Sequence, residues 1–228
     1  MNNNYTDIID DYIENLKGAL DNNLELIYII GSSATKDVVV GWSDIDCIIV
    51  ISNYNFNDIE TIKKISNSYD IKIGNTIYSK NEFEKGLLDQ KTIYYLLLNQ
   101  EKILNIAYIN SNLKIPNIDY NNCKNATKTL LFNDLHNCKR LLTYMNLDSG
   151  QVKSLFKKIY VIMKSILILH NYRPKNYKET FNMFSTNFNY EYFDYLKFIE
   201  DFKMNQVDEK KLKNYAFKLI VYVTDKIL

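Results

Sequence analysis

Arginine is almost absent from this chain of 228 residues. Only Arg140 and Arg173 are arginines among its 28 basic residues, and 27 acidic residues reduce the formal net charge to +1. Proteins that read a nucleic-acid sequence rely on arginine forks and on a strongly positive surface. The composition therefore argues against sequence-specific nucleic-acid binding and against a large polyanionic partner.

Cysteine and histidine are equally scarce. The three cysteines form no Cys-x-x-Cys pair, and the two histidines, His136 and His170, are far apart in the sequence. Neither a disulfide framework nor a Cys/His zinc site is indicated by this pattern. This pattern is what we expect of a protein in a reducing compartment.

Long apolar runs are also missing. None approaches the ~18 residues that span a bilayer, and residues 1–11 lack the basic start and apolar core of a signal peptide. We therefore expect a cytoplasmic protein with no membrane association. What the chain does contain, 46% hydrophobic and 24% charged residues, is typical of a folded globular protein with one large domain or two small ones.

The first half of the chain alternates between helical and strand patterns. Short runs rich in β-branched residues predict strands, and apolar residues at helical spacing predict helices. The expected strands are 24–30, 44–51, 71–78 and 103–108, and the expected helices are 6–20, 58–65, 82–88 and 92–98. The apolar run at 92–98 is equally compatible with a strand.

The second half shows helical patterns only. The polar segment 110–117, which contains Pro116, is the best candidate for a linker. Apolar stripes of period 3.6 then predict a bundle of helices at 123–146, 151–170, 177–185, 190–203 and 209–227. The expected fold class is α+β, with one domain at 1–112 and a helical bundle at 118–228.

One polar motif interrupts the apolar strands. Gly31-Ser32 follows the first strand, and eleven residues separate Ser32 from Asp44-Ile-Asp46 at the start of the second. Side chains two apart in a strand share a face, so the two carboxylates repel each other unless a cation sits between them. Magnesium prefers such hard oxygen ligands. Gly31 permits a tight turn, and Ser32 is expected to open a short helix whose backbone N–H groups can hold phosphate.

These residues resemble the hallmark of the nucleotidyltransferase superfamily of DNA polymerase β type, which has Gly-Ser after one strand and Asp-x-Asp on the next. The likeness covers residues 24–108 and implies a mixed sheet flanked by helices. The helical half resembles the C-terminal domain of small bacterial members, such as aminoglycoside nucleotidyltransferases and minimal members fused to HEPN domains. The alternative is that Asp44 caps a turn, Asp46 lies at the surface and Gly31-Ser32 is an ordinary loop.

The resemblance implies an enzyme that transfers a nucleoside monophosphate, AMP in the first instance, from ATP or another NTP to an acceptor hydroxyl. Pyrophosphate is released, and two Mg²⁺ ions would clamp the attacking and leaving oxygens. Asp44 and Asp46 would bind the metal. Ser32 and the backbone amides after Gly31 would hold the β- and γ-phosphates.

A third carboxylate on the next strand is usual in this family. Asp70, which opens the third expected strand, is the best match by position, both as a metal ligand and as a catalytic residue. A solvated aspartate at the strand end is the alternative. Glu82 and Glu84 are more remote candidates, because they are better explained as charges stabilised at a helix N-terminus. No residue is assigned as the general base.

Lys164 is flanked by apolar residues on both sides within the expected helix 151–170. A fully buried ammonium there needs a partner or a lowered pKa. One partner is the triphosphate of the nucleotide, which makes Lys164 a candidate nucleotide-binding residue. Alternatively, its stem covers apolar surface while the charge reaches water or a neighbouring carboxylate.

The acceptor and the activity leave three hypotheses. The first is a small molecule such as an aminoglycoside-type antibiotic, which would make the protein a resistance enzyme. The second is a protein side chain, modified with AMP as in toxin–antitoxin pairs of the minimal members. The third is a nucleotide-binding module without transfer activity. The expected partners are therefore an NTP and a small-molecule acceptor, and a homodimer is left open.

Overall fold

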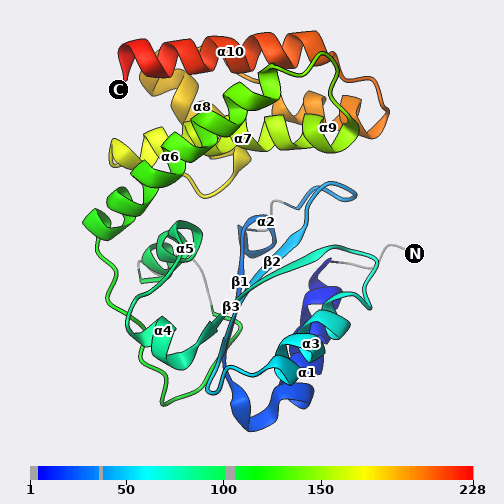
Figure 1. The fold of residues 1–228 in the computed structure, drawn as a ribbon, viewed down its shortest axis with the longest axis vertical. Helices are drawn as coiled ribbons and strands as arrows, with labels where there is room; N and C mark the ends of the chain where they lie inside the picture. Colours follow the sequence, from blue (N-terminus) through cyan, green and yellow to red (C-terminus); the bar gives the residue numbers. More distant parts are fainter. Residues whose placement is uncertain (1–4, 36–37, 101–105, 228) are drawn as a thin grey trace. The chain divides into compact units, whose positions relative to one another are not determined.

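The computed structural model describes residues 5–35, 38–100 and 106–227. The chain divides into two compact units, Met1–Cys123 and Lys124–Leu228, and each has its own buried core (Figure 1). The first combines a sheet with helices and the second is helical, which confirms the α+β class. Among the described helices, none has the length and apolar character needed to cross a membrane.

The first unit consists of a sheet with helices around it. Within the described residues its strands are β1 (Leu24–Ile30), β2 (Ile45–Ile51), β3 (Ile73–Ser79) and β4 (Tyr108–Ile109). Its helices are α1 (Tyr5–Leu20), α2 (Ser32–Thr35), α3 (Phe56–Ser66), α4 (Lys80–Glu84) and α5 (Gln90–Gln100), with a 3-10 turn, η1, at Asp21–Asn23.

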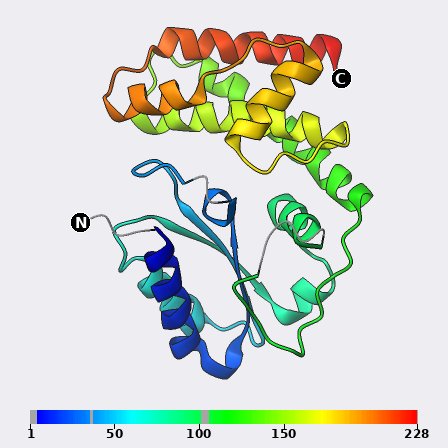
Figure 2. The same ribbon diagram turned by 180° about the vertical axis from the view of Figure 1, so that it is seen from behind.

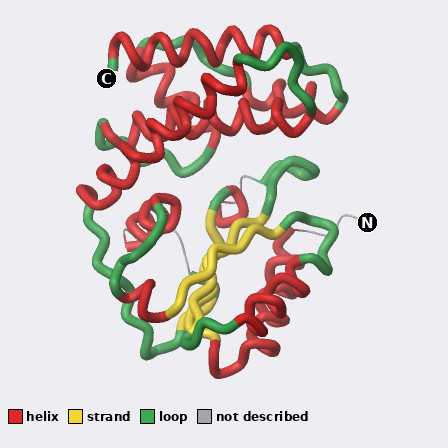
Figure 3. The backbone as a smooth tube through the Cα atoms, viewed as in Figure 1, coloured by secondary structure: helices red, strands yellow, loops and turns green. Residues whose placement is uncertain are grey.

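The described strands form a mixed sheet in the order β3-β2-β1-β4. Figure 3 shows this sheet in yellow, with helices in red around it. β1 is antiparallel to β2 and β4, whereas β2 and β3 are parallel. A parallel pair needs a crossover connection, and α3 lies on this crossover. The pairing places Ile30 opposite Asp46 and Asp46 beside Gly74. The end of β1 and the starts of β2 and β3 therefore meet at one end of the sheet, which we call the Asp46 end.

Helices cover both faces of the sheet. α1 and α3 lie on one face, and α4 and α5 lie on the other, as both views show (Figures 1 and 2). The core under α1 and α3 contains Tyr12 of α1 with Ile45 and Cys47 of β2. Strand alternation turns Asp46 and Ile48 to the opposite face. Within β2, only Asp46 is not fully buried.

The second unit is helical throughout its described residues. It contains most of α6 (Tyr120–Leu142), which begins in the first unit, followed by α7 (Ser149–Leu169), α8 (Tyr177–Phe188), α9 (Tyr195–Lys203) and α10 (Glu209–Lys226). α7 is central, because it packs against α8 and α10 and most of its apolar side chains are buried.

Aromatic rings and one ion pair hold the second unit together. Phe156 of α7 stacks on Phe198 of α9 with ring centroids 4.6 Å apart, and Phe181 of α8 joins the same cluster. Asp134 of α6 is buried, and the ammonium of Lys158 on α7 compensates its charge. Many of the aromatic residues of this half are therefore core residues.

The structure differs from the sequence prediction at several element boundaries, and the largest differences are in one strand and one helix. The strand expected at 103–108 is wrong in extent, since among described residues only Tyr108–Ile109 pair with β1, and 101–105 lie outside the described residues. The helix expected at 190–203 begins five residues later, at Tyr195. Asn189 ends α8 in a left-handed conformation with φ of 49°, and residues 190–194 belong to neither a helix nor a strand.

Candidate active site

Backbone from three strands surrounds one carboxylate at the Asp46 end of the sheet. Asp46 is the second residue of β2, and its neighbours are Ile30, the last residue of β1, and Gly74, the second residue of β3. Its side chain is 35% exposed, although the rest of the strand is buried. The carboxylate is therefore open to a ligand on one side and enclosed by the sheet on the other.

The Asp46 carboxylate occupies space that is free because two neighbouring residues are glycines without side chains. A Cβ added to Gly31 would lie 3.0 Å from Oδ2 of Asp46, and one added to Gly74 would lie 3.5 Å from Oδ1. Gly31 also has a φ of +73°, a conformation that residues with a side chain rarely adopt. We call the two glycines that flank Asp46, Gly31 and Gly74, the glycine cradle. The sequence motif predicted the turn at Gly31, but it did not single out Gly74.

The turn at Gly31 leads directly into α2. This helix begins at Ser32, as the sequence predicted, and has only four residues. The hydroxyl of Ser33, the next residue, is buried and has no hydrogen-bond partner among the described residues. The part that Ser32 and the amides after Gly31 play in phosphate binding stays a prediction.

Asp44 lies one residue ahead of β2 and is half-buried. The backbone oxygen of the preceding Ser43 accepts a 3.0 Å hydrogen bond from the Tyr5 hydroxyl of α1. Burial raises the pKa of Tyr5, and the negative charge of Asp44 adds to this effect. Ile45, between the two acids, points into the α1/α3 core, and alternation within β2 turns Asp46 away from it.

Lys91 is a member of the site that the sequence analysis missed. Its Nζ lies 2.8 Å from Oδ1 of Asp46, and its side chain is 44% exposed. Lys91 is the second residue of α5, a helix far from the Gly-Ser and Asp-x-Asp motif in the sequence. No sequence pattern links it to Asp46, because the contact depends on how α5 packs against the sheet.

A hydrogen-bond network fixes the start of α5 on β3. The Tyr78 hydroxyl lies 3.1 Å from Oγ1 of Thr92 and accepts the backbone N–H of Asp89, also at 3.1 Å. Asp89 caps the helix by accepting the Thr92 N–H at 2.7 Å. Burial raises the pKa of Tyr78, so its hydroxyl remains neutral. Lys91 lies between these two anchored residues and is held beside the face that carries Asp46.

Asp70 is not part of the third strand. β3 begins at Ile73, and Asp70 is exposed in the turn before it. The residue of β3 beside Asp46 is Gly74, which has no side chain. Among the residues that the structure describes, no three Asp, Glu, His or Cys side chains come close enough to share a metal ion. Asp44, Asp46 and Asp70 therefore do not form a three-carboxylate cluster.

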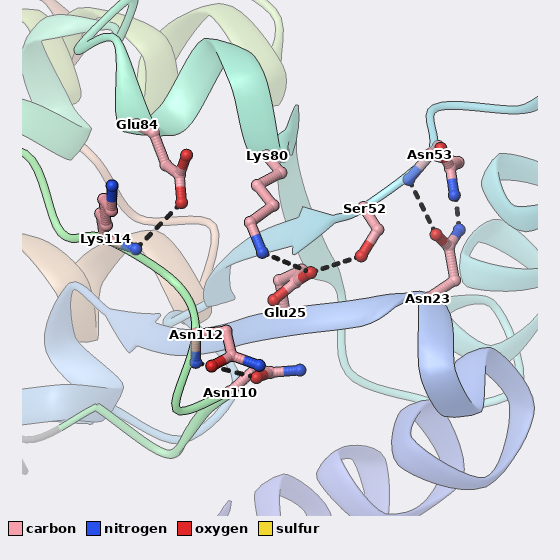
Figure 4. Close-up of polar contacts among 9 residues, drawn as sticks. All are labelled: Asn23, Glu25, Ser52, Asn53, Lys80, Glu84, Asn110, Asn112 and Lys114. Atoms are coloured by element: carbon pink, nitrogen blue, oxygen red, sulfur yellow. Dashed lines mark hydrogen bonds and ion pairs between the residues drawn. The ribbon is translucent and has the colours of Figure 1, made fainter.

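The two more remote glutamates lie at the opposite end of β3. Glu82 makes a capping box with Ser79, and the Ser79 backbone N–H and then its hydroxyl lower the pKa of Glu82. Glu84 accepts the Lys114 backbone N–H at 3.0 Å (Figure 4). β3 extends for about 16 Å between Gly74 and Ser79. Both glutamates are therefore explained by α4 and its surroundings, and neither belongs to the Asp46 end.

Lys164 belongs to the second unit, where it lies half-buried on α7. Its Nζ lies 5.8 Å from the centroid of the Tyr160 ring one turn earlier, which is within the range of a cation–π contact. The ammonium is therefore not fully buried, and its role toward a nucleotide stays a prediction. His136 and His170 are both exposed, and His170 packs edge-on against Phe188.

The donor set at the Asp46 end suits a magnesium ion. Mg²⁺ is commonly held by one or two carboxylates together with waters and substrate phosphates, and Asp44 and Asp46 supply the two carboxylates. Glycine at position 31 leaves room for Oδ2 of Asp46, because a Cβ there would lie 3.0 Å from that atom. The residue types present therefore suit the metal that the sequence predicted, which two carboxylates rather than three would hold, and the metal itself stays a prediction.

No protein-family model matches this sequence, and no curated protein matches it either. The likeness to the nucleotidyltransferase superfamily rests on Gly31, Ser32, Asp44 and Asp46, and on the architecture around them. Membership of that superfamily stays a prediction.

Proposed function

We propose that the protein is a magnesium-dependent nucleotidyltransferase that moves a nucleoside monophosphate, AMP in the first instance, from an NTP to an acceptor hydroxyl. The observation that carries this proposal is the glycine cradle around Asp46. Nothing in the core calls for a charged residue at this point of β2, where every other residue is buried. A partly exposed carboxylate that two glycines leave uncovered is what a ligand site requires.

The chain's own contribution is to position charge. Asp44 and Asp46 would hold the metal, and the backbone after Gly31, with Ser32, would orient the phosphates as α2 begins. A bound Mg²⁺ supplies charge neutralisation and polarises the phosphate under attack. Positioning and electrostatic stabilisation are the main sources of catalysis in reactions at phosphorus, so few side chains need to take part directly.

The reaction forms one bond and breaks one bond. The acceptor oxygen bonds to the α-phosphorus, the bond from that phosphorus to pyrophosphate breaks, and the hydroxyl proton passes to water. We favour a small molecule with several hydroxyls, of the aminoglycoside type, as the acceptor. This choice rests on the resemblance of the helical half, and a protein hydroxyl is the alternative outcome of the same assay.

A nucleotide-binding module without transfer activity is a second candidate. Two observations favour it: Gly74 occupies the strand position beside Asp46 where a third carboxylate would lie, and Lys91 already neutralises Asp46. Such a module would bind an NTP and release no pyrophosphate.

ATP labelled at its α-phosphate distinguishes these functions. The protein is incubated with labelled ATP and Mg²⁺, and either a panel of hydroxyl-bearing small molecules or a protein extract. Transfer of label with release of pyrophosphate, both abolished by EDTA, supports the transferase, and the labelled fraction identifies the acceptor class. Binding of ATP without transfer to either fraction supports the module. A protein that binds no ATP contradicts both functions.

A further inference from the structure

We propose that Lys91 is a counter-cation of Asp46 which a divalent metal displaces, and that the released ammonium then binds the phosphates of the nucleotide. Lys91 thereby couples metal binding to nucleotide binding. This inference rests on the proposed function, and it adds a positioning residue and a link between the two ligands.

Lys91 occupies one of the two oxygens of the carboxylate that would hold the metal. Its Nζ lies 2.8 Å from Oδ1 of Asp46, while Oδ2 faces Gly31. An ammonium and a divalent cation within bonding distance of the same carboxylate repel each other strongly. A metal that binds Asp46 must therefore move the Lys91 ammonium away from the carboxylate.

The exposure of the pair makes this movement feasible. Lys91 is 44% exposed and Asp46 is 35% exposed, so the separated charges can be hydrated. Ion pairs with this degree of exposure contribute little to stability, and a lysine side chain has several rotatable bonds. The backbone of Lys91 is in contrast held by the Tyr78, Asp89 and Thr92 network. The ammonium can therefore move while its attachment point stays beside the site.

The two ligands of the proposed reaction affect Lys91 in opposite ways. In the absence of nucleotide, metal binding breaks the Lys91–Asp46 pair and leaves the ammonium with water alone. When a triphosphate is present, the released ammonium gains charge-assisted hydrogen bonds to phosphate oxygens. Metal therefore binds weakly to the free protein and more tightly with nucleotide, and linkage requires the reverse effect to be equal.

Two binding titrations test this coupling without measuring turnover. The first measures Mn²⁺ binding to the nucleotide-free protein by electron paramagnetic resonance. The second measures binding of α,β-methylene-ATP, which cannot be cleaved at the α-phosphate, in excess Mn²⁺ by calorimetry. Each is carried out on the wild type, on Lys91→Met and Lys91→Arg, and on Lys85→Met, which removes an exposed lysine of the same unit. Thermal melting confirms that each variant is folded.

The proposal predicts opposite changes in the two titrations for Lys91→Met. Its Mn²⁺ affinity without nucleotide rises about two- to fivefold, because the competing ammonium is gone. Its affinity for the analogue in excess Mn²⁺ falls about tenfold, because a charge-assisted contact is lost. Lys91→Arg keeps the charge and stays near the wild type, and Lys85→Met matches the wild type in both titrations.

Other results overturn the inference. Unchanged or weaker Mn²⁺ binding by Lys91→Met shows that Lys91 does not compete with metal, and unchanged analogue affinity shows that it does not pass to the phosphates. A loss of both affinities in a folded Lys91→Met protein identifies a purely structural role. If the wild type binds neither Mn²⁺ nor the analogue, the proposed function fails together with this inference.

Discussion

Gly31 meets two requirements at once. Its φ of +73° favours glycine, and a Cβ at this position would lie 3.0 Å from Oδ2 of Asp46. Gly18, in the last turn of α1, is the opposite case, since a Cβ added there meets no atom within 4 Å. Gly31 is therefore required by the backbone conformation and by its contact with Asp46, whereas position 18 would accept a side chain.

Alanine at these two glycines should change stability in opposite directions. Gly31→Ala should lower the free energy of unfolding by about 1–2 kcal/mol, because the strained conformation and the contact with Asp46 both remain. Gly18→Ala should raise it by about 0.5–1 kcal/mol through helix propensity. Chemical denaturation of the two variants measures both values. Equal effects would show that Gly31 is not constrained as described.

A buried acid of β1 provides a second test at the residue scale. The Glu25 side chain is 5% exposed, and its Oε1 accepts hydrogen bonds from Lys80 Nζ at 3.0 Å and from the Ser52 hydroxyl (Figure 4). Lys80→Met should lower the free energy of unfolding by about 2 kcal/mol, because it leaves a buried carboxylate uncompensated. Lys63→Met, which removes an exposed partner of Glu60, should change it by less than about 0.5 kcal/mol. Denaturant titrations that give the same small value for both would contradict this role of Lys80.

At the scale of elements, local patterns predicted most helices and strands, and packing determined the rest. The predicted strand 24–30 has the bounds of β1. β3 instead begins two residues after the predicted start at 71, because the parallel register with β2 starts at Ile73. The run at 92–98 was ambiguous by period alone, and it is helical because Asp89 caps α5 just ahead of it.

The capping box of α4 predicts a pH dependence. The Ser79 backbone N–H and hydroxyl lower the pKa of Glu82 below its ordinary value of 4.5. A carboxyl whose pKa is lowered by folding stabilises the fold fully at a pH above its unfolded-state pKa. This stabilisation is lost as the pH falls through the folded-state pKa. Glu82→Gln should therefore be less stable than the wild type at neutral pH, with a difference that disappears in acid.

Denaturation at neutral pH and at about pH 3 measures this difference. The control is the same substitution in a Ser79→Ala background, which removes the hydroxyl but keeps the backbone N–H. There the pH-dependent difference should be smaller but still present. A difference between Glu82→Gln and the wild type that does not change with pH would show that the capping charge is not responsible.

At the scale of the whole molecule, the α+β class and the helical second half were predictable, whereas the composition of the site was predictable only in part. Gly31, Ser32, Asp44 and Asp46 are recognisable because a motif within one stretch of chain joins them. The places of Gly74 and Lys91 depend on strand register and on the packing of α5. Sequence alternation specifies which side chains share a face, but not which strand or helix lies next to them.

The same dependence on strand register explains why Asp70 lies outside β3. Its position near the start of the third predicted strand made it the best match for a third carboxylate, but the strand starts later and presents Gly74 to Asp46. The proposed chemistry of the first unit would therefore depend on Asp44 and Asp46.

The most direct test compares Asp46→Asn with Asp70→Asn in the transfer of labelled AMP from ATP. Each substitution removes a charge and keeps the volume of the side chain. Asp46→Asn should lower the Mg²⁺-dependent turnover by about 100-fold or more, because a metal ligand is lost. Asp70→Asn should leave turnover near that of the wild type, because Asp70 is exposed outside β3. Near-normal turnover of a folded Asp46→Asn protein in Mg²⁺ would contradict the assignment of the site.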